Sequence, residues 1–427
     1  MKFGSSIAAL SAAAASFANA SPATERRTPP LERKDLFGNT EFVKRWDNEK
    51  ISPKVMIISM FDPEAAVWYG IPEFDVLAQN ITLPGLSPLF PQVHCTADGE
   101  ICQFTTGESE INAASTVMSV VLSPKFNLTN TYFMVAGIAG INPEVATICS
   151  VTFAKYAVQV ALQYEIDIRE LPANYTTGYV PFGVDKPDEY PTSIYGTEVF
   201  ELNEALQDYA YQVASKVALN DSDEAIAYRA NYASADIYAA GAAPPGVYKC
   251  DVATSDVYYS GRLLGEAFGN TTKLFTNGSG VYCSTAQEDN ATLEVLVRTA
   301  AAGLVDFARV LVMRTASDFD REYPGESAAF NLFYSTQGSF LPAIKNLYLA
   351  GLPIVQGIIS EWDSVFKAGL PAPNYIGDIF GTLGGKPDFG PADFDVTPSK
   401  KREVEQPKSR LEMLRRRGPK AGPAVTA

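Results

Sequence analysis

Histidine is almost absent from this chain, since His94 is the single histidine among 427 residues. No two cysteines have the CxxC spacing, so the usual ligand set of a structural zinc site is missing. A Ser-His-Asp hydrolase would have to use His94, and no GxSxG motif supports one. We therefore expect no metal, no other cofactor and no serine-hydrolase triad.

Long uninterrupted apolar runs are also scarce beyond the first 20 residues. The apolar stretches 132–162 and 292–313 are interrupted by charged residues such as Lys155 and Arg298. Neither supplies the roughly 20 apolar residues that a membrane-spanning helix needs. The C-terminal end has no apolar segment for a lipid-linked anchor. We expect that this chain does not form a membrane pore by itself.

Basic charge is scarce outside the C-terminal end. The chain has 34 Lys and Arg against 49 Asp and Glu, a formal charge of −15. Nine of those basic residues, against three Glu, lie in residues 399–427, so the rest of the chain is strongly acidic. A nucleic-acid backbone requires a basic face, so we expect no nucleic-acid partner. Small neutral ligands remain compatible with this charge.

The N-terminal end is typical of a secretory signal. Lys2 is followed by an Ala-rich apolar region and by the small-x-small site Ala18–Asn19–Ala20. We predict a signal peptide over 1–20, a polar leader over 21–50, and a secreted or cell-surface protein. Seven Asn-x-Ser/Thr sequons beyond the predicted signal peptide suit a glycoprotein. They are Asn80, Asn127, Asn174, Asn220, Asn270, Asn277 and Asn290.

The five cysteines fit an oxidising compartment. Cys95 and Cys102 flank a short turn-like loop, which predicts a small disulfide. Cys250 and Cys283 are placed to pair across neighbouring strands. Cys149 lies in an apolar run and is predicted to be a buried free thiol.

Apolar segments alternate with amphipathic ones through most of the chain. A buried strand at 54–61 precedes a helix that begins after Pro63, and 100–123 is typical of a strand, a Gly turn and a helix. Segment 131–159 predicts two strands around a Gly-rich turn, and 291–308 has a helical apolar face that leads directly into a strand. This alternation predicts an α/β fold with a mixed or mostly parallel sheet, as a single large domain over 51–384. Residues 385–427 are rich in Pro, Gly and charge and are predicted to be a disordered basic tail.

The strand that starts at Val310 delivers Asp318 near its carboxyl end. Ligands of α/β proteins bind at these ends of the strands. Asp318 could instead cap the next helix, but Pro324 and Gly325 separate it from the helical pattern that starts near Glu326. We therefore favour a functional role for Asp318.

Four segments are notable, in this order: a first strand with an acidic turn (57–64), a Gly-rich segment (135–154), a helix start (285–296) and a strand that ends in Ser-Asp (312–320). As an ordered set they resemble the nucleoside phosphorylase and nucleosidase superfamily. Within that superfamily the pattern is most similar to the fungal purine nucleoside permease family, over about residues 54–365. The resemblance implies a central mixed sheet flanked by helices, purine nucleosides as ligands, and a homo-oligomer.

The resemblance also implies roles for individual side chains. Asp318 would hydrogen-bond or protonate N7 of the purine, with Ser317 orienting it, and a carboxylic acid of raised pKa suits that role. Glu288, with Gln287 beside it, would accept hydrogen bonds from the ribose hydroxyls. The alternative for Glu288 is a first-turn residue favoured by the helix dipole.

Three further candidates have equally plain alternatives. Tyr258 resembles the residue that stacks on the purine, although a single Tyr is more often part of the core. Gly137 and Gly140 would let the backbone approach the ligand, or would permit a tight turn. Glu64 lies one residue beyond the position of the nucleosidases' water-activating Glu, so it is either an offset catalytic base or an early helix carboxylate.

Several functions are compatible with this pattern. The turn 104–110 has Glu108 and Glu110 but no Arg or Lys, where phosphorylases bring arginines to the phosphate. We favour a protein that binds purine nucleosides outside the cell for uptake, either with a membrane partner or by an indirect route. The alternative is a secreted enzyme that cleaves the N-glycosidic bond, as a hydrolase rather than a phosphorylase. A structural glycoprotein is disfavoured because the chain is neither repetitive nor rich in Ser and Thr.

Overall fold

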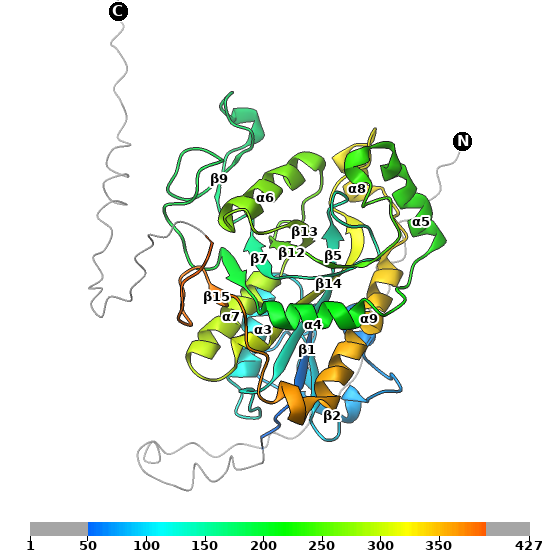
Figure 1. The fold of residues 1–427 in the computed structure, drawn as a ribbon, viewed down its shortest axis with the longest axis vertical. Coiled ribbons are helices and arrows are strands. Elements are labelled where there is room, and N and C mark those ends of the chain that lie inside the picture. Colours follow the sequence, from blue (N-terminus) through cyan, green and yellow to red (C-terminus); the bar gives the residue numbers. More distant parts are fainter. Residues whose placement is uncertain (1–49, 390–427) are drawn as a thin grey trace, which may run out of the picture. The chain divides into compact units, whose positions relative to one another are not determined.

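The computed structural model describes residues 50–389 (Figure 1). The predicted signal peptide, most of the predicted leader and the tail from residue 390 lie outside the described residues. Residues 385–389 of the predicted tail are described, and Phe389 is buried with its ring edge-on to Tyr156.

One large mixed sheet forms the centre of the described chain. Its main path runs in the order β15 (Gly377–Asp378), β10 (Val199–Glu201), β7 (Tyr156–Gln159), β12 (Asp251–Thr254), β13 (Tyr282–Ala286), β5 (Tyr132–Ile141), β1 (Val55–Ser59), β4 (Ile101–Thr105), β3 (Gln92–Cys95) and β2 (Gln79–Thr82). β14 (Val310–Phe319) and β6 (Val151–Phe153) pair with each other, β14 also pairs with β5, and β11 (Val247–Lys249) pairs with β6. The pair β8 (Tyr164–Glu165) and β9 (Tyr179–Val180) stands apart from it. β1 is parallel to both β4 and β5, whereas β13 is antiparallel to β5, which confirms the predicted mixed α/β sheet.

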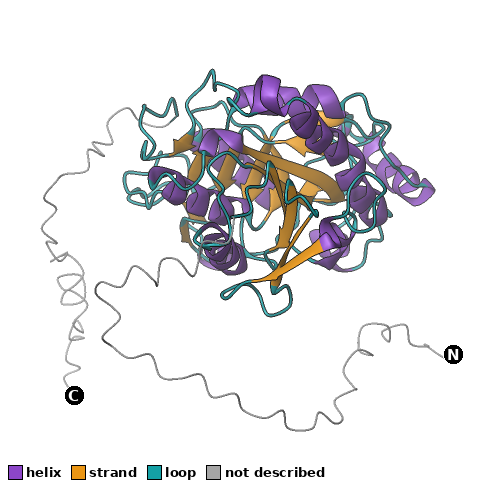
Figure 2. Cartoon of the chain, turned by 90° about the horizontal axis from the view of Figure 1, so that it is seen from below, coloured by secondary structure: helices purple, strands orange, loops and turns teal. Residues whose placement is uncertain are grey.

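Helices cover both faces of this sheet (Figure 2). Met56 and Ile58 of β1 pack in one core cluster with α3 (Glu110–Val121) and α7 (Asp289–Ala301). Val55 and Ile57, which point the opposite way because side chains alternate along a strand, pack with α4 (Glu204–Ala214) and α9 (Phe340–Ser360). The strands are therefore apolar on both faces. The remaining helices are α2 (Asp62–Ala66), α5 (Asp223–Arg229), α6 (Arg262–Phe275) and α8 (Ala328–Phe333).

Helix α9 corrects the expectation that no apolar stretch is as long as a membrane span. It is the one helix in residues 50–389 that is long and apolar enough to cross a bilayer. Leu347, Ile354 and Val355 of α9 are nevertheless buried in the core beside strand residues such as Met313. A core helix of a soluble protein meets the same criterion, so α9 is weak evidence for a span.

Two local predictions were wrong. Gly137 and Gly140 lie inside the ten-residue strand β5 rather than in a turn, and the chain continues into β6 and β7. The predicted continuous passage from helix to strand is interrupted as well. α7 ends at Ala301, Gly303 takes a positive φ of 73°, and a 3-10 turn (Phe307–Arg309) precedes β14.

The cysteines are paired as predicted. Cys95 and Cys102 lie opposite each other on β3 and β4 and form a disulfide, and Cys250 is joined to Cys283 of β13. Cys149 is a buried free thiol, and its burial raises its pKa to about 12.

Candidate functional site

A cavity of about 820 Å³ lies where several strands reach their carboxyl ends. The last residues of β5 and β13 pair there, with Gly140 opposite Thr285, and β14 runs beside β5 to the same place. Its volume is typical of a small-molecule site. The side chains that line it include Glu64, Tyr258, Gln287, Glu288, Arg314, Ser317 and Asp318. All the predicted site side chains therefore line one cavity.

Asp318 is held at the pocket wall by two hydroxyl groups. Ser317 donates to its Oδ1 (2.7 Å) and Tyr258 donates to its Oδ2 (3.1 Å). Burial raises the pKa of the Asp318 carboxyl, and these two hydrogen bonds oppose that rise. The next helix, α8, is capped by Ser327, so Asp318 is not its cap. The geometry suits a carboxylic acid that can share a proton with a ligand.

Glu288 lies just after β13, at the start of α7, and is buried. It makes no capping hydrogen bond. Its Oε1 instead accepts from the backbone N–H of Ser109 (2.9 Å), and its Oε2 accepts from Arg314 (3.1 Å). Burial raises the pKa of Glu288, and the Arg314 charge opposes the rise. Tertiary contacts, more than the helix dipole, therefore fix this carboxylate.

Arg314 is a pocket residue that the sequence reasoning did not select. Its side chain, on β14, is buried. It forms ion pairs with Glu288 and with Asp289 (2.6 Å) and donates a hydrogen bond to the carbonyl of Ile138 (3.0 Å). The sequence did contain a signal for Arg314. It is a cation inside the apolar run that starts at Val310, and a buried charge needs partners. Among the described residues that line the cavity, Arg314 is the single cation. The lining also includes five carboxylates: Glu64, Glu108, Glu224, Glu288 and Asp318.

Glu64 also belongs to the pocket, although Pro63 precedes it. Its side chain is buried and reaches back from α2, so that Oε2 accepts from the N–H of Met60 (2.7 Å) and Oε1 from the N–H of Ile138 (2.7 Å). Burial raises the pKa of Glu64 to about 8, against the opposing charge of Arg314. Glu64 therefore lies in the first turn of α2, as the helical alternative predicted, and its buried carboxylate also lines the cavity.

The two glycines of β5 permit close packing. A Cβ on Gly137 would lie 1.9 Å from Cε of Met60 and 2.8 Å from Oε1 of Glu64. A Cβ on Gly140 would lie 2.3 Å from Oγ1 of Thr285, on the strand that crosses β5. Neither glycine has a positive φ. Gly140 lines the cavity, whereas Gly137 makes room for the side chains behind it.

Of the remaining candidates, Tyr258 and Gln287 line the cavity and His94 does not. Tyr258 is 64% exposed, so it is not a core aromatic, and it lies at the pocket beside Asp318. Gln287 lines the cavity and donates to the carbonyl of Asp256 (3.1 Å). His94 contacts Asn80 (2.5 Å) on β2 and is not among the lining residues, which argues against a Ser-His-Asp triad.

These features define an α/β protein with an acidic small-molecule pocket at the carboxyl ends of its strands. A family model described as purine nucleoside permease matches residues 52–371. The chain belongs to this family.

The chain is similar to the following relatives and solved structures. The purine nucleoside permease of Candida albicans is 50% identical over 350 residues, which cover 81% of this chain and 84% of that protein. A Schizosaccharomyces pombe protein named as a probable purine nucleoside permease is 42% identical over 318 residues, covering 73% and 90%. Futalosine hydrolase of Helicobacter pylori is similar in structure with a TM-score of 0.42 and 16% identity, covering 71% and 98%. The 5′-methylthioadenosine/S-adenosylhomocysteine nucleosidase of the same organism gives 0.43 and 15%, covering 73% and 100%.

Proposed function

We propose that this chain binds extracellular purine nucleosides in the described cavity and acts in their uptake. The observation that carries the proposal is the meeting of Asp318, Glu288 and Tyr258, from three separate segments, in one cavity of suitable size. The family model and the Candida albicans relative, both described as purine nucleoside permease, support the same ligand class.

The chemistry of the three side chains matches the parts of a purine nucleoside. A purine N7 is an acceptor, and a protonated Asp318 would donate to it; the raised pKa of Asp318 favours that form. The exposed ring of Tyr258 would cover the base. Each Glu288 oxygen accepts one hydrogen bond from the protein, so a lone pair on each is left for the vicinal ribose hydroxyls.

The charge of the pocket favours uncharged nucleosides over nucleotides. Arg314 is already paired with Glu288 and Asp289, so it does not offer an open cationic site to a phosphate. The lining carboxylates would repel a phosphate group. We expect inosine to bind, inosine monophosphate to bind at least about tenfold more weakly, and inorganic phosphate not to compete.

We place the protein outside the cell or at its surface, as a secreted glycoprotein, on the basis of its signal-like N-terminus and its sequons. α9 would have to leave the core in order to cross a bilayer. We therefore propose that a separate membrane protein carries the nucleoside across. A homo-oligomer stays a prediction, to be measured by light scattering of the purified protein.

Uptake of labelled inosine tests the transport role. Fungal cells that lack their own nucleoside uptake would express either the wild-type chain or the Asp318→Ala variant. Wild-type cells should accumulate the label and variant cells should not, at equal amounts of protein. Accumulation that is equal in both would refute a role for this pocket in uptake.

Hydrolysis of the nucleoside is a second candidate, and the position of Glu64 favours it. This carboxylate lies in the cavity beside Arg314, where a base for water would be needed. Chromatography that measures release of the free base, with and without phosphate, distinguishes a hydrolase from a phosphorylase. Release without phosphate supports a hydrolase, whereas release that needs phosphate would contradict the phosphate exclusion proposed above.

A further inference from the structure

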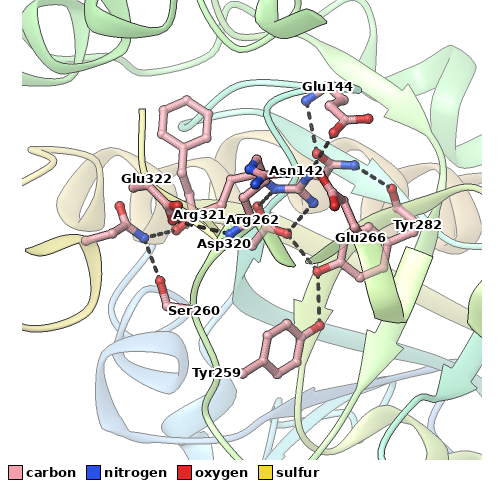
Figure 3. Close-up of polar contacts among 12 residues, drawn as sticks. Asn142, Glu144, Tyr259, Ser260, Arg262, Glu266, Tyr282, Asp320, Arg321 and Glu322 are labelled. Carbon is pink, nitrogen blue, oxygen red and sulfur yellow. Dashed lines mark hydrogen bonds and ion pairs between the residues drawn. The ribbon is translucent and has the colours of Figure 1, made fainter. Parts of the chain in front are cut away.

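A buried ion pair, Asp320 with Arg321, follows the pocket residue Asp318 after Phe319. Arg321 donates through Nε to Oδ1 of Asp320 (2.8 Å) and through Nη2 to its Oδ2 (2.9 Å). A third donor, Nη1, reaches Glu144 in the segment after β5 (2.8 Å). Figure 3 shows these groups with their neighbours. Asp320 and Arg321 are both almost completely buried and do not line the cavity.

This pair is tied to the loop that carries Tyr258. The hydroxyl of Tyr282 donates to Oδ2 of Asp320 (2.7 Å) and lies 3.1 Å from the hydroxyl of Tyr259 (Figure 3). The backbone N–H of Gly261 donates to the carbonyl of Asp320 (2.8 Å). Residues 255–261 are thus attached at two points to the segment that follows Asp318.

The two neighbouring tyrosines of this loop point to different partners. Tyr258 donates to Asp318 in the pocket, whereas Tyr259 reaches Tyr282 and through it the ion pair. Packing leaves little space for this arrangement to shift. A Cβ on Gly265 of α6 would lie only 2.3 Å from Nη2 of Arg321. Because Arg321 is packed so tightly, it can hold loop 255–261 at a fixed distance from β14.

We propose that Asp320 and Arg321 are positioning residues that hold loop 255–261, through Tyr282 and Tyr259, so that Tyr258 stays within hydrogen-bonding distance of Asp318. They set the affinity for the ligand without touching it. The inference deepens the proposed function and rests on it, because Tyr258 and Asp318 are the residues assigned to the purine.

The variant Tyr282→Phe tests this link while it leaves the ion pair in place. It removes both hydroxyl contacts of Tyr282 and keeps the ring. The matched control is Tyr132→Phe, which removes a buried hydroxyl that donates to the carbonyl of Phe366 (3.0 Å) on another part of the sheet. Calorimetry should give a Kd for inosine about tenfold higher for Tyr282→Phe, and an unchanged Kd for the control.

A double-mutant cycle separates positioning from a general loss of structure. In the background of Tyr258→Ala, the change Tyr282→Phe should add less than about twofold to the Kd, because its effect passes through Tyr258. An equal loss in both backgrounds, or no loss in either, would overturn the inference.

Hydrogen exchange gives a measurement that does not depend on the ligand. Backbone amides of residues 255–261 should exchange faster in Tyr282→Phe than in the wild-type protein, and the control should not differ. Unchanged exchange would overturn the positioning role even if nucleosides bind. If the wild-type protein binds no nucleoside but the loop exchanges faster in the variant, the proposed function fails and the loop attachment stands.

Discussion

Asp318, Glu288 and Glu64 are three carboxyl groups that line the same pocket and have different hydrogen-bond partners. Asp318 is held by two hydroxyls, Glu288 by a backbone N–H and Arg314, and Glu64 by two backbone N–H groups. Burial raises the pKa of all three, and Arg314 opposes the rise at Glu288 and Glu64. Arg314 therefore favours the ionised forms of Glu288 and Glu64, whereas the partners of Asp318, the group assigned to the purine, are two neutral hydroxyls.

The assignment of Glu288 to the sugar predicts a difference between ribosides and free bases. In Glu288→Ala the Kd for inosine should rise about 10- to 100-fold, since two hydrogen bonds to a charged group are lost. The Kd for hypoxanthine, which has no ribose, should change by less than about twofold. Competition binding of the two ligands to the same preparation checks this. A parallel loss of both affinities would show that Glu288 does not contact the ribose.

The buried Glu64 predicts a dependence of stability on pH. Its pKa is raised from an ordinary 4.5 to about 8, so the folded state keeps a proton that the unfolded state releases within that interval. Its contribution to stability is complete below the unfolded pKa and is lost as the pH rises through the folded pKa. Between about pH 5 and pH 9 the Tm of the wild type should fall about 5 °C further than that of Glu64→Gln.

Thermal unfolding of both proteins in parallel, at constant ionic strength, measures that difference. Other buried carboxylates, such as Asp251, contribute equally to both curves and cancel. Two curves that stay parallel over the whole range would mean that Glu64 is ionised in the folded protein.

At the scale of elements, the site depends on how closely β5 approaches its neighbours. Gly137→Ala should lower the free energy of unfolding by about 1–3 kcal/mol, because the new methyl group overlaps Met60 and Glu64. It should also displace Glu64 and weaken ligand binding. The matched control is Gly269→Ala in α6, where the Cβ would lie 3.8 Å from Tyr282 in ordinary contact.

Urea unfolding of both variants checks this prediction. Gly269→Ala should be neutral or stabilising by up to about 1 kcal/mol, as expected for a helical glycine. If Gly137→Ala were as stable as this control, the close approach of β5 to Met60 would be refuted.

Several elements could be predicted from the sequence because local pattern decides them. The buried strand β1, helix α3 after its Gly turn, and the Cys95–Cys102 pair follow from periodicity and spacing. Helix α2 was predicted as well, but it begins at Asp62 and includes Pro63 rather than starting after it. The segment with Gly137 and Gly140 was predicted to contain a turn, and the choice between a turn and a close approach stayed open for the two glycines, since a glycine has the same local signature in both. The approach itself is made by Met60 and Thr285, which are far away in the sequence.

The candidate site could also be predicted only in part, because some of its contacts join residues that are far apart in the sequence. Asp318 follows from its place at the carboxyl end of a strand, and Glu288 and Tyr258 follow from the family resemblance. Arg314 was missed, although its charge stands in an apolar strand. Its ion pairs with Glu288 and Asp289 join β14 to α7, and no local pattern indicates such a pairing.

At the scale of the whole molecule, the sequons give a prediction about the surface. Six of the seven asparagines are exposed: Asn80, Asn127, Asn174, Asn220, Asn270 and Asn277. Asn290 is buried in α7, and its side chain is bonded to Thr254 (2.7 Å). If the protein is secreted as proposed, glycans should be found among the exposed six and not at Asn290. Peptide mass spectrometry before and after glycan removal tests this, and a glycan at Asn290 would contradict the packing of α7.

The central claim is that this cavity binds an uncharged purine nucleoside, and calorimetric titration of inosine tests it most directly. The full secreted chain would be compared with Asp318→Ala in phosphate-free buffer. The account predicts saturable binding with one site per chain, and a Kd at least about tenfold higher in the variant. Absence of binding, or the same affinity in both proteins, would contradict it.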